Sequence, residues 1–162
     1  MKKTLAFILC AIMLLSMAAC SSKGDESGNS EAEKPGDTMA LEEMFDKVLE
    51  GIEDLPELGQ MAVEPDLFES YLFIQPIDGA EAVVSEAMIN AVAHSAVLLR
   101  VPEGTDVEAV RAEIETNANP RKWVCVEAEK TAVVANGSTI LLVMSDASVV
   151  DAMVANFNGL WA

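Results

Sequence analysis

The chain is poor in basic residues and in aromatic residues, and each shortage excludes a class of function. Ten lysine and arginine residues stand against 27 aspartate and glutamate residues. Because phosphate contacts need a basic surface, this balance argues against nucleic-acid binding. Aromatic residues make up 5% of the chain, which is too little for a platform that stacks sugars or bases.

The chain also lacks the common motifs of catalysis and metal binding. It has no Cys-x-x-Cys or His-Glu-x-x-His pattern, no EF-hand loop, no glycine-rich phosphate loop and no Gly-x-Ser-x-Gly elbow. The single histidine, His94, precedes Ser95 in a strand-like run. Adjacent strand residues point to opposite faces of a sheet, so these two side chains do not form a catalytic dyad. The sequence therefore predicts a protein that is not an enzyme and holds no metal or cofactor.

The N-terminus has the layout of a secretory signal peptide. Lys2 and Lys3 are followed by an apolar stretch over residues 4–17 and by the small residues Ala18 and Ala19. The alternative is an uncleaved membrane anchor, but a span needs about 20 apolar residues and this run is shorter. We therefore predict a signal peptide over residues 1–19.

The residues around the expected cleavage site resemble the lipobox of bacterial lipoproteins. The motif stands here as Ser16-Met17-Ala18-Ala19-Cys20, with Met17 in place of the commoner leucine. The resemblance implies that diacylglycerol is attached to Cys20 and that the chain is cut between Ala19 and Cys20. The alternative is an ordinary signal peptide with an incidental cysteine. Lipid on Cys20 would hold the protein at the outer face of the cytoplasmic membrane.

Cleavage at this site would leave a strongly acidic chain with one further cysteine. Eight basic residues would remain against all 27 acidic ones, so the formal net charge becomes −19. Cys10 leaves with the signal peptide and Cys20 carries lipid. Cys125 then has no partner for an intramolecular disulfide.

Residues 20–38 are rich in serine, glycine and glutamate and predict a disordered linker. As a flexible coil, such a linker has a root-mean-square span of roughly 25 Å. We predict one folded domain over residues 39–162, beginning with an amphipathic helix at 39–53. The acidic face of that helix is interpreted as a solvated surface, with a cation or a basic partner as the alternative.

The rest of the domain alternates strand and helix patterns. Strands are predicted at 80–87, 95–101, 123–126, 131–135 and 139–144, with 123–135 taken as one strand broken near Ala128. Helices are predicted at 65–71, from a capping box at Thr105 and Glu108 to residue 118, and at 146–156. Asn136-Gly137 predicts a hairpin with a type I′ turn.

An internal repeat suggests how these elements assemble. Residues 95–114 align without a gap on residues 138–157, a shift of 43 positions. Each half is then a strand–strand–helix unit. We predict an α+β fold with a four-stranded, mainly antiparallel sheet, two helices on one face, and the N-terminal helix beside them. The other face would be open to solvent or to a partner.

Four side chains stand out as candidates for function, and all four are expected to be structural. His94 is interpreted as a loop or strand-start residue without a role. Cys125 is expected to be buried in a strand as a small hydrophobic residue. Trp123 is expected at the edge of the core, although Arg121 and Lys122 beside it leave an interaction site as the alternative. Trp161 is expected to pack the last helix down.

The domain resembles a family of small, uncharacterised lipoproteins of Gram-positive anaerobic bacteria that share a domain of unknown function. The similar segments are MINAVAHSAVLLRV, the helix with Val-Glu-Ala-Val, NGSTILLVMS and the closing helix with Asn-Phe. Many members have an acidic residue where Ala93-His94-Ser95 stands here. The resemblance implies fold and location but no activity.

Together these features predict a membrane-anchored, non-catalytic module that binds a protein at the cell envelope. One alternative is an accessory lipoprotein that binds a small ligand or a cation. A second alternative is a hydrolase that uses two carboxylates, which would have to face each other in a cleft.

Overall fold

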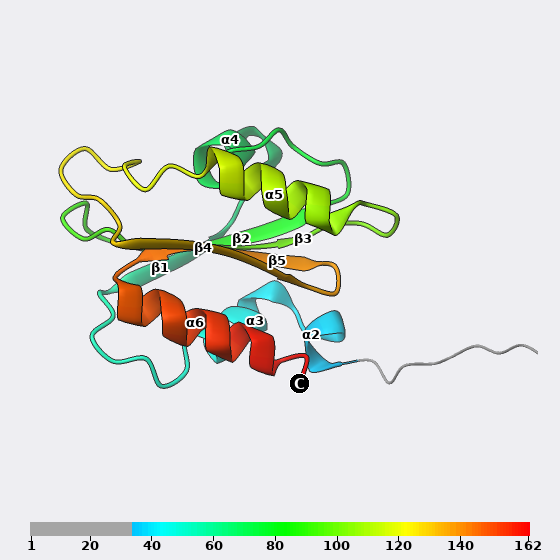
Figure 1. Cartoon of the computed structure of the whole chain (residues 1–162), viewed down its shortest axis with the longest axis horizontal. Coiled ribbons are helices and arrows are strands. Elements are labelled where there is room, and N and C mark those ends of the chain that lie inside the picture. Colours follow the sequence, from blue (N-terminus) through cyan, green and yellow to red (C-terminus); the bar gives the residue numbers. More distant parts are fainter. Residues whose placement is uncertain (1–33) are drawn as a thin grey trace, which may run out of the picture. The chain divides into compact units, whose positions relative to one another are not determined.

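A five-stranded antiparallel sheet forms the centre of the domain (Figure 1). The computed structural model describes residues 34–162. Its elements are α2 (Pro35–Thr38), α3 (Leu41–Val48), β1 (Leu58–Ala62), η1 (Pro65–Leu67), α4 (Phe68–Tyr71), β2 (Glu81–Ala87), β3 (Ser95–Arg100), α5 (Val107–Asn117), β4 (Lys130–Asn136), β5 (Thr139–Ser145) and α6 (Ala147–Gly159). The strands follow the order β1-β2-β3-β5-β4. The predicted signal peptide, the cleavage site at Ala19 and the lipidation site Cys20 lie outside the described residues.

The predicted α+β class with an antiparallel sheet is confirmed, but the prediction of four strands is wrong. The additional strand is β1, which pairs with β2 from Leu58 opposite Ala87 to Ala62 opposite Val83. Its sequence, LGQMA, contains a glycine and a glutamine and no β-branched residue. The residues that favour strands are therefore absent. This segment is a strand because it pairs with β2.

The prediction that the helices share one face of the sheet is also wrong. Figure 1 shows α4 and α5 above the sheet and α3 and α6 below it. Each face has its own apolar cluster: Val97, Leu99 and Ile140 point towards α5, and Leu98, Leu141 and Val143 point towards α3 and α6. Because both faces are covered, the central residues of β3 and β5 (96–99 and 140–144) are continuous apolar runs rather than alternating ones.

The connections after β3 and β5 explain why α5 and α6 take opposite faces. Only Asp146 separates β5 from α6, so α6 lies on the side to which the last residue of β5 points. Six residues separate β3 from α5, and the first of them, Val101, is buried in the cluster below α5. The repeat thus describes the two strands, because the aligned residues Leu98 and Leu141 lie opposite each other in the sheet. It does not describe the two helices, which lie on opposite faces.

The β4–β5 hairpin is confirmed, but its turn lies one residue later than predicted. Asn136 pairs with Thr139, so the two turn residues are Gly137 and Ser138. Only Gly137 has a positive φ, at 55°. A type I′ turn needs positive φ at both central positions, so the predicted turn type is wrong although the glycine was the correct signal.

The ends of two helices differ from the sequence prediction. α3 stops at Val48 rather than at residue 53, and Gly51 follows with a φ of 73°. A glycine in this left-handed conformation is a common helix terminator. At α5 the N-cap is Asp106, whose Oδ1 accepts a hydrogen bond of 3.0 Å from the Ala109 amide. The predicted capping box, which begins at Thr105, is therefore wrong by one residue.

The apolar segment at residues 123–126 is a loop, not the predicted strand. The Ala128 amide donates to the Pro120 carbonyl at 3.0 Å, and this bond closes the loop at its base. Held in this way, the segment cannot extend along the sheet. Cys125 is consequently exposed, so its predicted burial is also wrong.

The last residues of the predicted linker, 35–38, form α2 and are fastened to the C-terminus. The Gly36 amide donates to the Leu160 carbonyl at 3.2 Å, and Trp161 Nε1 donates to Asp37 Oδ1 at 2.8 Å. Gly36 lies so close to the Trp161 ring that a Cβ atom would overlap it. Trp161 in turn packs on Phe157 of α6 with 4.9 Å between ring centroids, which confirms its predicted role.

Arg100 at the end of β3 strengthens this attachment. Its Nη2 donates to the Gly36 carbonyl at 3.2 Å and to the Met39 carbonyl at 2.8 Å, and its Nε donates to Thr139 Oγ1 at 3.3 Å. One guanidinium group therefore donates hydrogen bonds to two carbonyls around α2 and connects them to the central strands β3 and β5. We call these contacts of Gly36, Asp37, Met39, Arg100 and Trp161 the N-terminal clasp.

Candidate interaction surface

His94 is buried in the core, where its Nδ1 lies 3.0 Å from Ser145 Oγ. The exposed fractions of His94 and Ser145 are 0% and 3%, so solvent and substrates do not reach this pair. Burial lowers the pKa of His94, and the nearby carboxylates of Glu86 and Asp146 partly oppose this shift. Among the described residues Nε2 has no hydrogen-bond partner. His94 directly precedes β3, as predicted for a loop or strand-start residue, and its side chain lies in the core.

Ser95 follows His94, so its side chain points to the opposite face of the sheet. There it contacts Lys122. Lys122 Nζ lies 3.1 Å from Ser95 Oγ and 2.5 Å from Glu86 Oε1. The same ammonium group lies 4.8 Å from the ring centroid of Tyr71 and 5.5 Å from that of Trp123. Burial, together with Glu86, raises the pKa of Tyr71. These contacts hold the base of the 119–128 loop on the sheet and place Trp123 half-buried beside the core.

Metal binding and membrane spanning find no support in the described part of the chain. Between residues 34 and 162, no three histidine, cysteine or acidic side chains come together as a metal site. None of the helices in this range is both long and apolar enough to cross a bilayer. The hollows and the exposed apolar side chains of these residues are the remaining candidates for a functional surface.

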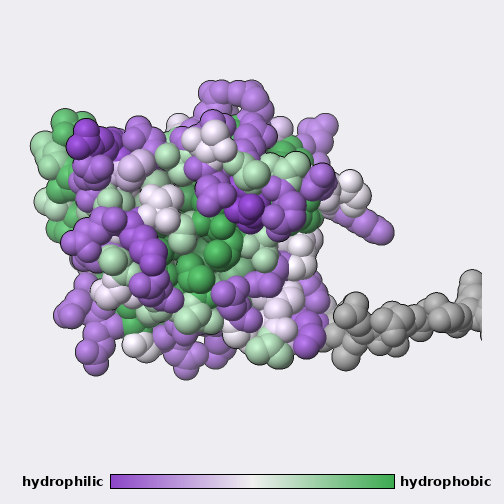
Figure 2. All heavy atoms as spheres, viewed as in Figure 1, coloured by the Kyte–Doolittle hydropathy of each residue, from purple (hydrophilic) through white to green (hydrophobic). Residues whose placement is uncertain are grey.

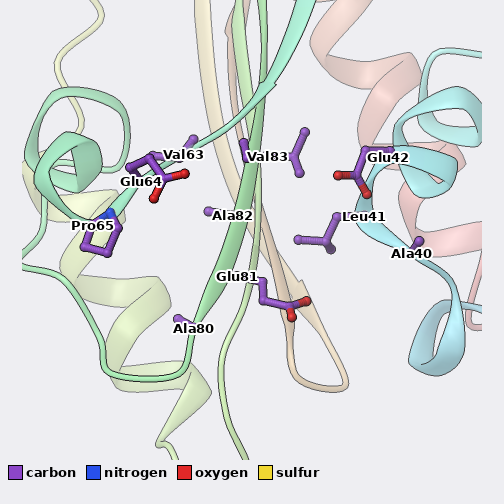
Figure 3. Close-up of a pocket in the computed structure, with 11 residues that line it drawn as sticks. Ala40, Leu41, Glu42, Val63, Glu64, Pro65, Ala80, Glu81, Ala82 and Val83 are labelled. Atoms are coloured by element: carbon purple, nitrogen blue, oxygen red, sulfur yellow. The ribbon is translucent and has the colours of Figure 1, made fainter.

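A hollow of about 430 Å³ lies where β1 leaves the edge of β2. Figure 3 shows Glu64 and Pro65 on one side, Leu41 and Glu42 on the other, and Glu81 of β2 between them. Three carboxylates thus border the hollow, and no basic residue lines it. This region is acidic but open, and its carboxylates do not converge as cation ligands would.

Large apolar side chains are exposed on β1 and in two neighbouring loops. The exposed fractions are 45% for Met61, 64% for Met88, 57% for Ile89 and 100% for Val124. Met88 and Ile89 follow β2 directly, and Val124 lies in the 119–128 loop. Figure 2 shows hydrophobic atoms gathered on the left, where Figure 1 places these two loops. Exposed apolar groups that cluster in this way are typical of contact sites.

Two hollows connect these side chains into one surface. The first, of about 220 Å³, is lined by Gly59, Gln60, Met61, Val84, Glu86, Ala87 and Met88. The second, of about 350 Å³, is lined by Glu86, Asn90, Lys122, Trp123, Val124 and Cys125. Glu86 borders both. We call the first hollow, together with Met61, Met88, Ile89 and the outer edge of β1, the edge surface.

Comparison of the chain with protein-family models, with curated proteins and with solved structures finds no match. The resemblance to a lipoprotein family therefore stays a prediction, and the function must be inferred from the geometry.

Sequence reasoning missed the edge surface for two reasons. The strand that forms it lacks the usual strand residues, so its edge was not anticipated. Met88 and Ile89 belong to a mostly apolar stretch that continues into β3, and nothing in that pattern separates exposed from buried positions. Only the register of β2 against β3, which ends at Glu86 opposite Ser95, places Met88 and Ile89 beyond the paired strands.

Proposed function

We propose that the protein is an extracytoplasmic lipoprotein whose folded domain binds a protein partner through the edge surface, without catalysis. The observation that carries the proposal is the cluster of Met61, Met88 and Ile89 beside the outer edge of a strand. A lone exposed hydrophobic residue needs no explanation, but a cluster next to an apolar hollow is typical of recognition sites. The buried position of His94 and Ser145 favours a non-catalytic role.

The position of the edge surface suits a tethered protein. The described chain begins next to α2 and the C-terminus, on the right in Figure 1, whereas the 88–93 and 119–128 loops lie at the opposite end. These loops therefore lie away from the residue at which the described chain begins.

Replacement of Cys20 by alanine tests the lipid anchor. We expect the variant to lose the mass of the acyl groups and to move from the membrane fraction to the soluble fraction, because the thioether carries the lipid. Intact mass and fractionation measure both changes. Cys125→Ala is the matched control and should keep both the acyl mass and the membrane location. An unchanged mass for Cys20→Ala would refute the lipoprotein proposal.

Site-specific photo-crosslinking in intact cells tests the binding surface. A photoactivatable residue at Ile89 is expected to capture one dominant envelope protein. The control position is Glu103, which is exposed and lies at the other end of β3. Capture of the same proteins from both positions, or from neither, would contradict a partner site at the edge surface.

The alternative of a ligand- or cation-binding lipoprotein is tied to the acidic hollow near Glu64 and Glu81. Thermal unfolding with Ca²⁺ or Mg²⁺ separates the two proposals, since a ligand that binds the native state raises the melting temperature. The protein-partner proposal expects no shift.

A further inference from the structure

The outer edge of β1 presents unpaired backbone groups at every second residue. The Val63 amide donates to the Ala82 carbonyl, and the Met88 amide donates to the Glu57 carbonyl. In an antiparallel ladder this pattern directs the odd-numbered residues of β1 towards β2. Leu58, Gln60 and Ala62 must therefore point their N–H and C=O groups outwards. No described residue pairs with them, because β1 ends the sheet.

Gly59 creates room for a side chain next to this edge. Gly59 lies opposite Glu86, and Met61 lies opposite Val84, so all four face the same side of the sheet. Because Gly59 has no side chain, the space between Met61 and Met88 is the hollow of about 220 Å³. A strand added along β1 would direct every second side chain to this face. One of these side chains would enter the hollow.

The charge around the edge favours a basic partner. Between Lys47 and Arg100 the sequence contains no lysine or arginine. The same stretch contains ten acidic residues: Glu50, Glu53, Asp54, Glu57, Glu64, Asp66, Glu69, Asp78, Glu81 and Glu86. All of them are exposed except Glu86, which is half-buried and pairs with Lys122. Complementary charge speeds association and disfavours acidic partners.

Other occupants of this edge fit less well. The chain's own segment 21–34 is acidic and has no apolar residue larger than alanine to fill the hollow. A second copy would bring two acidic edges together. The opposite edge of the sheet, β4, is at least partly covered at every residue, lies between α5 and α6, and begins with Lys130, which pairs with Asp151. Charged residues of this kind protect an edge from strand addition.

We propose, resting on the function proposed above, that the partner contributes an extended basic segment that adds to β1 as a sixth strand and inserts an apolar side chain beside Gly59. Backbone hydrogen bonds to Leu58, Gln60 and Ala62 provide affinity, and the hollow provides selectivity, as in other cases of strand addition.

A synthetic probe tests the strand addition directly. The probe is a blocked peptide of about seven residues in which lysine alternates with leucine or valine, a length and pattern suited to one added strand. Its affinity for the purified domain is measured by fluorescence anisotropy. Methylation of the backbone nitrogens at one set of alternate positions removes the hydrogen bonds to β1, and methylation of the other set leaves them. We expect the first set to weaken binding by about tenfold or more and the second by less than about threefold.

Two substitutions in β1 complete the test from the protein's side. Gln60→Pro removes an outward N–H that β2 does not use, and Gln60→Ala keeps it. Gly59→Val fills the hollow, and the space allows it, because a Cβ at Gly59 meets only Met88 at 3.7 Å. We expect Gln60→Pro and Gly59→Val each to lower the affinity for the probe peptide by about tenfold. The affinity of Gln60→Ala should be close to that of wild type. Should Gln60→Pro fail to fold, Gly59→Val still decides the outcome.

The outcomes separate this inference from the proposed function. Equal affinity for both methylated peptides would mean association by charge alone and would overturn strand addition. So would formation of a dimer through β1 in solution. Capture from Ile89 in cells that persists in Gly59→Val and Gln60→Pro would keep the interaction module but reject the sixth strand. Loss of capture in both variants, but not in Gln60→Ala, supports the inference.

Discussion

Replacement of Phe157 by alanine is expected to lower the free energy of unfolding by about 3–5 kcal/mol, the range for large aromatic residues in a core. Phe157 is fully buried between α6 and the sheet, and its ring also supports Trp161. The substitution therefore creates a cavity and removes the surface on which the N-terminal clasp is built. For a domain whose total stability is typically about 5–15 kcal/mol, this loss is a large fraction.

Urea unfolding, monitored by circular dichroism, measures the change for Phe157→Ala. The matched control on the same helix is Val154→Ala, a partly buried position, for which we expect a loss below about 1.5 kcal/mol. The emission of Trp161 should also shift in Phe157→Ala, because the indole loses its neighbouring ring. A loss no larger than that of Val154→Ala would show that the ring pair does not support this end of the domain.

The second large effect is a loss of stability in mild acid that depends on His94. Burial holds the pKa of His94 below its ordinary value of 6.5 in the folded domain. As the pH falls below 6.5, the unfolded chain takes up a proton that the folded chain does not. The free energy of unfolding therefore decreases, at about 1.4 kcal/mol per pH unit at most for one proton, until the pH reaches the folded pKa. Above 6.5 this group contributes no pH dependence.

The comparison of wild type with His94→Gln measures this effect. His94 is the only histidine, so in the range between pH 7 and about 5 few other groups titrate. We expect the free energy of unfolding of the variant to vary less with pH in this range than that of wild type. Ser145→Ala, which removes the partner of Nδ1 but keeps the imidazole, should retain the pH dependence. Parallel curves for wild type and His94→Gln would contradict the assignment.

The sequence predicted the centre of the sheet well because burial on both faces leaves an unmistakable pattern. The central residues of β3 and β5 are continuous apolar runs, and Gly137 marks the turn before β5. The same criterion misplaced residues 123–126, which are equally apolar. There the decisive contacts are Lys122 with Glu86 and the bond that closes the loop at Pro120. Neither a contact with a distant residue such as Glu86 nor the closure of a loop appears in the local apolar pattern.

The candidate site was harder to predict because it depends on a strand with weak local preference. β1 exists through its pairing with β2, and its outer edge becomes visible only when the strand order is known. The choice of face for each helix likewise depends on connection length and on the burial of Val101. The acidic character is evident from the composition alone, and it informs the proposal of a basic partner.

The N-terminal clasp also determines how the domain responds to mechanical load. A pull on the chain before Pro35 acts first on the hydrogen bonds of Gly36 and Asp37 with the C-terminal residues and on the hold of Arg100. These bonds lie outside the sheet, so they can break one after another while the strands stay paired. Release of residues 35–40 would lengthen the chain by about 20 Å at full extension. In the lipoprotein that we propose, the clasp would thus yield before the sheet and act as a short extensible element between the lipid and the edge surface.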